Sequence, residues 1–225
     1  MKTAKPAAAK SSRLGLDVYE KKRDFTKTPE PKPARAKLRG PLGFVIQKHR
    51  ASALHYDFRL EAGGTLRSWA VPKGPSLDPK QRRLAMEVED HPLEYASFEG
   101  TIPEGEYGGG TVMLWDEGVW APMEDVDPAK ALDSGEIRFI LDGKKLKGSW
   151  TLVSTGDRKW LLMKRRDEFA DPKVDITLAE PRSVRTNRLL ADIAKAGGGD
   201  VKKAATGDPP GARSGEPAPR KAAAK

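Results

Sequence analysis

Two of the chain's three histidines stand close together in the pattern His49-x5-His55-x-Asp57-x-Arg59. Two imidazoles and one carboxylate suit Mn²⁺, Zn²⁺, Fe²⁺ or Co²⁺, and three protein ligands leave coordination positions open, as in catalytic metal sites. The chain has no cysteine, so any metal must be bound through nitrogen and oxygen ligands. The pattern therefore predicts an open site for a divalent metal at His49, His55 and Asp57.

Arg59 adds a fixed positive charge beside this predicted metal site. A cation next to a metal is unfavourable unless an anion shares the site, and arginine binds phosphate or carboxylate oxygens through two parallel hydrogen bonds. The combination suits a phosphoryl group, because the metal polarises one oxygen while Arg59 offsets charge that develops on another. Ordinary hydrogen-bonding surface residues would give the same pattern, and the residue types alone leave both interpretations open.

Strand alternation would bring these side chains together. In residues 54–60 apolar and polar side chains alternate at every position, so each kind faces one side of the strand. A short connector at residues 50–53 would fold the preceding strand, residues 44–49, back beside it. His49 would then lie next to the polar face that carries the other three members of the pattern.

The rest of the middle region also reads as short strands. Further candidates are residues 66–71, 84–91, 111–116, 136–141, 149–154 and 159–165. Turn signals separate several of them, at Glu117-Gly118, Asp142-Gly143 and Gly156-Asp157. About eight short strands predict a mainly β fold, a single small closed or nearly closed antiparallel β-barrel. One or two short helices are expected, at residues 128–132 and 183–194.

Two other features favour structural roles. The glycine-rich run at residues 105–110 lacks the Lys-Ser/Thr pair of a phosphate-binding loop, so it predicts a tight turn that enters a strand. The tryptophans in the strand candidates could stack on bases, but packing in the core is the favoured interpretation.

Composition divides the chain into a folded middle and two tails. Residues 1–13 hold four basic and no acidic side chains, and residues 195–225 hold seven basic and three acidic ones, so they carry +8 of the net charge of +9. Every aromatic residue and histidine lies between them. This predicts one domain at residues 14–194 and disordered basic tails on both sides. Such tails raise affinity for nucleic-acid phosphates without sequence preference, or serve solubility alone.

Nothing in the sequence predicts a membrane protein. The longest purely apolar runs are short, and the N-terminal residues lack the apolar core of a signal peptide. A cytoplasmic protein is expected, associated with the nucleoid if it acts on DNA.

Three blocks of the sequence resemble the phosphoesterase domain of bacterial DNA ligase D and occur in the same order. They are YEKKRDFTKTPEP, FVIQKHRASALHYDFRLEAGGTLRSWAVPKGPS and EDHPLEYASFEGTIPEGEYGGGTVMLWDEGVW, and the resemblance runs from about residue 14 to residue 166. It implies a small β-barrel that uses a divalent metal, Mn²⁺ first and Co²⁺ or Zn²⁺ as alternatives. The implied reaction removes 3′-terminal ribonucleotides and 3′-phosphates from DNA, leaving a 3′-OH for non-homologous end joining.

The resemblance also implies roles for individual residues. It makes His49, His55 and Asp57 the metal ligands, and Arg59 and His91 the catalytic residues that engage the scissile phosphate. The residues that it places along the substrate site are Arg23, Glu30, Gln47, Lys73, Arg83 and Tyr95. Without it, an ordinary hydrogen-bonding role at a strand end is the favoured interpretation of His91.

Ligase activity is not expected. The K-x-D-G motif of adenylating ligases is absent, and its nearest match has Ile140 where the nucleophilic lysine would stand. We expect a stand-alone phosphoesterase that works with a separate end-joining polymerase, ligase and end-binding proteins. Two other functions stay open on the residues alone. One is a two-His-one-carboxylate iron oxygenase, and the other is a non-catalytic module that binds DNA ends or recruits repair partners.

Overall fold

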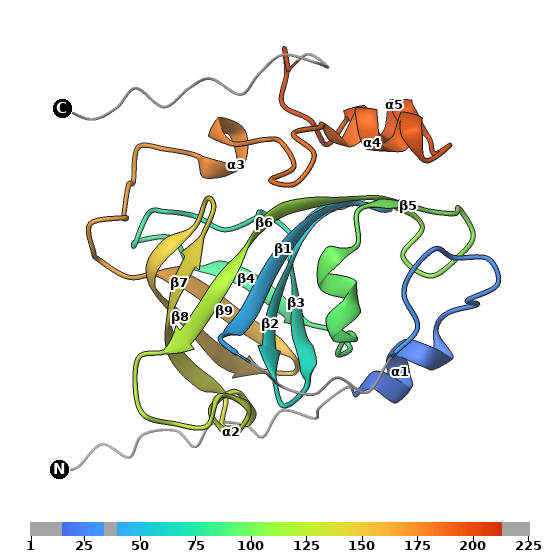
Figure 1. The fold of residues 1–225 in the computed structure, drawn as a ribbon. Helices are drawn as coiled ribbons and strands as arrows, with labels where there is room; N and C mark the ends of the chain where they lie inside the picture. Colours follow the sequence, from blue (N-terminus) through green and yellow to red (C-terminus); the bar gives the residue numbers. More distant parts are fainter. Residues whose placement is uncertain (1–14, 34–39, 213–225) are drawn as a thin grey trace, which may run out of the picture.

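The computed structural model describes residues 15–33 and 40–212, which form an antiparallel β-barrel with short helices around it (Figure 1). In spatial order the barrel strands are β1 (Leu42–Arg50), β2 (Leu54–Ala62), β3 (Thr65–Val71), β4 (Arg83–Glu87), β9 (Lys159–Lys164), β8 (Lys147–Gly156), β7 (Glu136–Gly143) and β6 (Gly110–Pro122). Pairing of β6 with β1 closes the barrel, and β5 (Gly100–Ile102) adds to β6 outside the ring. The predicted mainly β fold, a closed antiparallel barrel of about eight strands, is confirmed.

Aromatic side chains fill the interior of the barrel. Because successive residues of a strand face opposite sides, every second side chain points inward and packs against those of the facing strands. The rings of Trp69 and Trp160 meet edge to face at 5.6 Å, and Tyr56 meets Trp115 in the same way at 5.3 Å. All four are buried in one hydrophobic cluster. The predicted packing of the tryptophans in the core is confirmed.

Strand β6 is longer than the sequence predicts. It continues through Glu117-Gly118, where a turn was expected, to Pro122. Gly118 lies opposite Gly143 of β7, and a Cβ atom on Gly118 would collide with the carbonyl oxygen of Asp142. The glycine is needed for the close approach of two strands, which the sequence does not distinguish from a turn.

Strand β4 is shorter than predicted. It ends at Glu87, whereas the alternation suggested a strand through residue 91. His91 then returns to β3 through an isolated bridge, in which its backbone N–H donates to Leu66 and its carbonyl accepts from Leu66. The three-residue strand β5 was not predicted, because so short a segment shows no alternation.

The helices are short, and only part of them was predicted. The expected helix at residues 128–132 is α2 (Pro128–Asp133), and the one expected at residues 183–194 is confined to α4 (Leu190–Ala196). Residues 183–186 instead form a turn, in which the Ser183 hydroxyl accepts from two backbone N–H groups. The others are α1 (Leu16–Lys21), a 3₁₀ helix (Leu93–Ser97), α3 (Ile176–Ala179) and α5 (Val201–Ala205). None of the helices in the described ranges is long and apolar enough to cross a bilayer.

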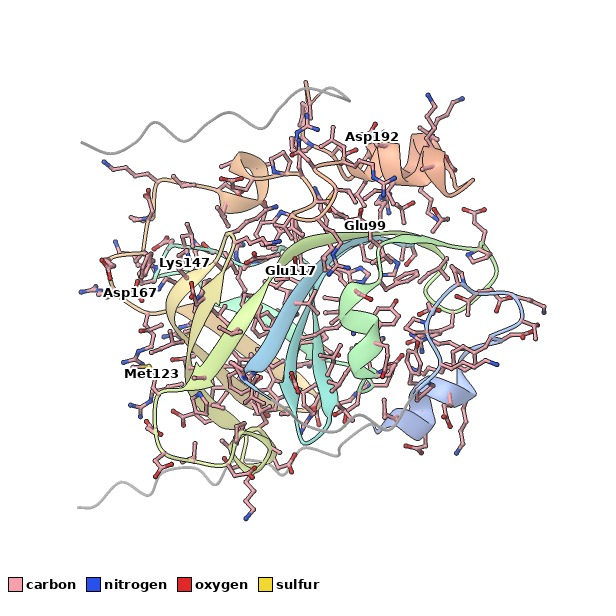
Figure 2. All side chains as sticks on the ribbon, in the orientation of Figure 1. Glu99, Glu117, Met123, Lys147, Asp167 and Asp192 are labelled. Atoms are coloured by element: carbon pink, nitrogen blue, oxygen red, sulfur yellow. The ribbon has the colours of Figure 1, made fainter. Side chains whose placement is uncertain are left out.

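The ordered chain extends past residue 194, where a disordered tail was predicted. Helix α5 follows α4, and both lie across one end of the barrel, with side chains filling the space beneath them (Figures 1 and 2). Ala204 joins the barrel's hydrophobic cluster together with Leu190 and Ile193. The prediction is wrong for residues 195–212. It rested on the average composition of the segment, which does not show that a few apolar residues such as Ala204 pack against the barrel. The other tail residues, 1–13 and 213–225, lie outside the described residues.

This packing leads to a stability prediction. Ala204 is 1% exposed, whereas its neighbour Ala205 is exposed. Ala204→Asp would bury an unpaired carboxylate, so we expect a loss of at least about 2 kcal/mol in the free energy of unfolding. Ala205→Asp is the matched control and should stay close to wild type. Denaturant unfolding of both variants checks this, and equal stabilities would mean that α5 does not pack on the barrel.

Candidate active site

The predicted metal ligands lie on the outer wall of the barrel, on strands β1 and β2. In the antiparallel register His49 stands opposite His55, and Gln47 stands opposite Asp57. Tyr56, between His55 and Asp57, points into the core. The predicted hairpin is confirmed, with residues 51–53 as its connector.

The three side chains converge on one point. One ligand atom from each of His49, His55 and Asp57 lies within 4.8 Å of the other two. Nδ1 of His49 is 3.5 Å from one carboxylate oxygen of Asp57, and Nε2 of His55 is 3.7 Å from the other. These separations suit three ligands arranged around a single ion.

Backbone carbonyls orient both imidazoles for metal binding. Nε2 of His49 is 2.9 Å from the carbonyl oxygen of Gly108, and Nδ1 of His55 is 3.1 Å from that of Ala53. A carbonyl oxygen only accepts, so each of these nitrogens carries the hydrogen. The lone pairs therefore sit on the nitrogens that face Asp57. A divalent metal requires such a set of donor atoms, and it also requires hydrogen bonds that hold the ligand rings in place.

Asp57 is held in its ionised form. Burial acts to raise its pKa, but the positive charge of Arg59 and the neighbouring His55 and His49 outweigh burial and hold the pKa well below its usual range. Nη2 of Arg59 is 3.2 Å from the carboxylate. The site thus offers one carboxylate and two imidazoles as ligands.

Arg59 is 2% exposed and is fixed on several sides. Its Nε donates to Gln47 at 2.8 Å, and its Nη1 donates to the Ser68 hydroxyl at 2.9 Å and lies 2.9 Å from Nδ1 of His91. With Nη2 directed at Asp57, at least three of its five N–H groups are engaged by neighbouring side chains. The guanidinium therefore organises the other site residues as well as lining the cavity.

His91 is buried between two tyrosine rings. Its ring centroid is 4.9 Å from that of Tyr19 and 4.7 Å from that of Tyr95. Burial, together with the charges of Arg59 and Arg23, holds the pKa of His91 well below its usual value. The ring is therefore uncharged, and acid catalysis by His91 requires a bound anion to raise that pKa.

The N-terminal segment brings Arg23 and Glu30 to the same place. Nε of Arg23 donates to Glu30 at 2.8 Å, and Nη1 of Arg23 lies 3.3 Å from Glu89. A cavity of about 250 Å³ results. The predicted residues that line it are Arg23, Glu30, His49, His55, Asp57, Arg59, His91 and Tyr95.

Three predicted site residues lie elsewhere. Gln47 is fully buried beneath the cavity, where its amide holds Arg59 and donates to the carbonyl oxygens of Tyr95 and Phe98. Lys73 and Arg83 line a different cavity, at the end of the barrel covered by the C-terminal segment. Lys73 follows β3 and Arg83 begins β4, so the position of both side chains depends on the closure of the barrel.

Several residues around the metal ligands were not predicted. Glu89 is buried and pairs with both Arg23 and Lys22. It stands two residues before His91, and in a strand this spacing could have indicated that Glu89 shares a face with His91. Tyr107 lines the cavity, and its hydroxyl accepts from Lys22 at 2.9 Å. The turn predicted for the glycine-rich run was correct, but nothing in the sequence indicated that Gly108 orients a metal ligand.

Fold and site together define a β-barrel protein whose outer wall carries an open His/His/Asp cluster that could hold a metal ion. Residues 47–154 match the DNA Ligase D 3′-phosphoesterase domain, and the barrel belongs to that family.

Relatives in end joining agree with this assignment. A multifunctional non-homologous end joining protein LigD from Pseudomonas aeruginosa is 51% identical over 183 residues, 78% of this chain and 22% of the relative. The corresponding DNA repair protein of Mycobacterium tuberculosis is 43% identical over 160 residues, 71% of this chain and 21% of the relative. The chain thus spans about a fifth of the length of these relatives.

Proposed function

We propose that this protein is a divalent-metal-dependent 3′-phosphoesterase that heals DNA 3′ ends. It would remove 3′-terminal ribonucleotides as a phosphodiesterase and 3′-phosphates as a phosphomonoesterase, leaving a 3′-OH. The observation that carries the proposal is the convergence of His49 Nδ1, His55 Nε2 and the Asp57 carboxylate, with the other nitrogen of each imidazole held by a carbonyl oxygen. Membership of the 3′-phosphoesterase family supports the choice of reaction.

The surrounding residues suit a phosphate ester. Mn²⁺ held by His49, His55 and Asp57 would act as a Lewis acid towards a phosphate oxygen. Arg59 lines the same cavity, and its guanidinium would offset negative charge that develops in the transition state. Burial raises the pKa of Tyr95 well above its usual value, so its hydroxyl stays protonated and can donate to the substrate.

The relatives' printed names support a role in non-homologous end joining. We propose that the substrate is a primer–template end that carries a 3′-ribonucleotide or a 3′-phosphate. A polymerase, a ligase and end-binding proteins of the same pathway would then act on the healed end, in the cytoplasm near the nucleoid. Sealing of the nick would be their task, since the barrel carries no adenylating lysine motif.

A primer–template assay tests this function. A labelled primer ending in one ribonucleotide, and a second ending in a 3′-phosphate, would be incubated, both anaerobically and in air, with the protein and Mn²⁺, Co²⁺, Zn²⁺ or no metal. We expect metal-dependent products with a 3′-OH. Metal-dependent activity that requires oxygen would support an oxygenase instead. Tight binding of the ends without product under any of these conditions would support a non-catalytic module.

A further inference from the structure

The inner face of the metal-binding hairpin opens onto a second cavity. Lys48 and Tyr56 stand opposite each other in β1 and β2, each next to a metal ligand in sequence but on the other side of the wall. They line a cavity of about 420 Å³ between the barrel end and the C-terminal segment. One β-hairpin therefore separates this cavity from the metal site.

Lys48 forms no direct hydrogen bond or ion pair with any residue in the described part of the chain, although Asp208 attracts its charge from a distance. The residue is 2% exposed. The nearest aromatic ring, that of Tyr56, is 5.8 Å from Nζ. A buried cation is unfavourable unless an anion or a set of acceptors compensates it, so this position is arranged for a negatively charged ligand.

Two further basic residues line the same cavity. Lys73 is exposed at its rim, and Arg83 is partly buried in its wall. Within the described residues, the Nε of Arg83 is buried without a hydrogen-bond partner. The cavity thus presents three cations, two of which have polar hydrogens that no neighbouring side chain accepts.

The two carboxylates of this cavity are engaged in helix caps. Both oxygens of Asp208 accept backbone hydrogen bonds at 3.0 Å, from Leu190 and Ala191 at the start of α4. Asp175 accepts from the backbone and the hydroxyl of Thr177 at the start of α3. These acids hold the C-terminal helices in place, and three cations against two carboxylates leave the cavity with a net positive charge.

We propose that this cavity is a second phosphate-binding site, formed by Lys48, Lys73 and Arg83, which holds a backbone phosphate of the same nucleic acid whose 3′ end occupies the metal site. The proposal rests on the proposed function. A strand that crosses the exposed tip of the hairpin, at Ser52 and Ala53, would engage both sites.

The test compares DNA lengths in wild type and Lys48→Met. The probes are a 3′-phosphorylated dinucleotide and a 3′-phosphorylated primer–template long enough to pass the hairpin tip. We expect wild type to bind the long probe more tightly than the dinucleotide. Lys48→Met should reduce this gain in affinity about tenfold, which is the contribution of one charge-assisted contact. The slope of log K against log salt for the long probe should fall by about 0.9.

Lys147→Met is the matched control. Lys147 projects from β8 and pairs with Asp142 on the side of the barrel away from α1 (Figure 2). This variant should keep the full gain and the full salt slope. Lys48→Met removes an uncompensated charge and keeps the length of the side chain, so its melting temperature should not fall. Arg83→Gln provides a second, independent test and should also reduce the gain.

The outcomes separate this inference from the proposed function. An equal gain in wild type and Lys48→Met, at the same salt slope, would overturn the second site. A loss of the same size on the dinucleotide would also overturn it, because Lys48 would then act through the metal site. Turnover of the dinucleotide by wild type tests the phosphoesterase function itself, independently of Lys48.

Discussion

Asp57→Asn is expected to lower metal-dependent turnover on the order of 10³-fold or more. Asp57 is the one anionic member of the His/His/Asp set, and asparagine has nearly the same shape without the charge. Lewis-acid stabilisation of a phosphoryl transition state is worth several kcal/mol, and each 1.4 kcal/mol changes a rate about tenfold. Calorimetry with Mn²⁺ and the primer assay, on the same preparation, would measure binding and turnover.

The histidine ligands should behave in the same way. His49→Ala and His55→Ala each remove one nitrogen ligand from an outward-facing position, so circular dichroism should show a folded barrel. Asp142→Asn on the exposed face of β7 is the control for asparagine and should turn over like wild type. Wild-type Mn²⁺-dependent activity in His49→Ala, His55→Ala or Asp57→Asn would contradict the ligand assignment.

Arg59→Ala is expected to affect both turnover and stability. The substitution leaves the buried Asp57 without its cation and Gln47 and Ser68 without a donor. Breaking a buried pair in this way commonly costs about 3–5 kcal/mol of folding free energy. Loss of a donor that stabilises transition-state charge reduces the rate about 10²–10³-fold. Denaturant unfolding and the primer assay would separate the two effects.

Arg59→Lys makes the test more specific. A single ammonium group cannot reach Gln47, Ser68 and Asp57 at once, so the variant should fold but stay well below wild type in turnover. Arg67→Lys is the matched control. Arg67 is also buried and pairs with Glu87 and Asp133, but it does not line the metal cavity. It should lose stability without loss of turnover, whereas full activity of Arg59→Lys would mean that the planar guanidinium is not required.

The convergence of His49, His55 and Asp57 could be predicted because it depends on local rules. Period-two alternation puts His55 and Asp57 on one face, and a three-residue connector fixes the register that sets His49 opposite His55. The barrel followed from the number of short strands and turn signals. These inferences need only neighbours in sequence.

The remaining features depend on contacts between distant segments. Glu89 and Tyr107 join the site through contacts with the N-terminal segment. Arg23 and Glu89 are 66 residues apart in sequence, and Lys22 and Tyr107 are 85 residues apart. The anchoring of Arg59 by its neighbours requires Gln47, Ser68 and Asp57 to be in place at once. Composition cannot reveal such arrangements, and for the same reason it missed the docking of α5 on the barrel.

The chemistry of this protein sits on the outside of a wall whose inside is the hydrophobic core. Apart from Lys48 at the barrel end, neighbouring residues along β1 and β2 therefore serve unrelated purposes, since one set fills the barrel and the other lines the outer site. Evolution or engineering can repack the interior for heat resistance with little effect on the reactive groups. Conversely, the specificity of the outer face can be altered without repacking the barrel. The stability of the barrel and the reactivity of its outer face can thus change separately within one short hairpin.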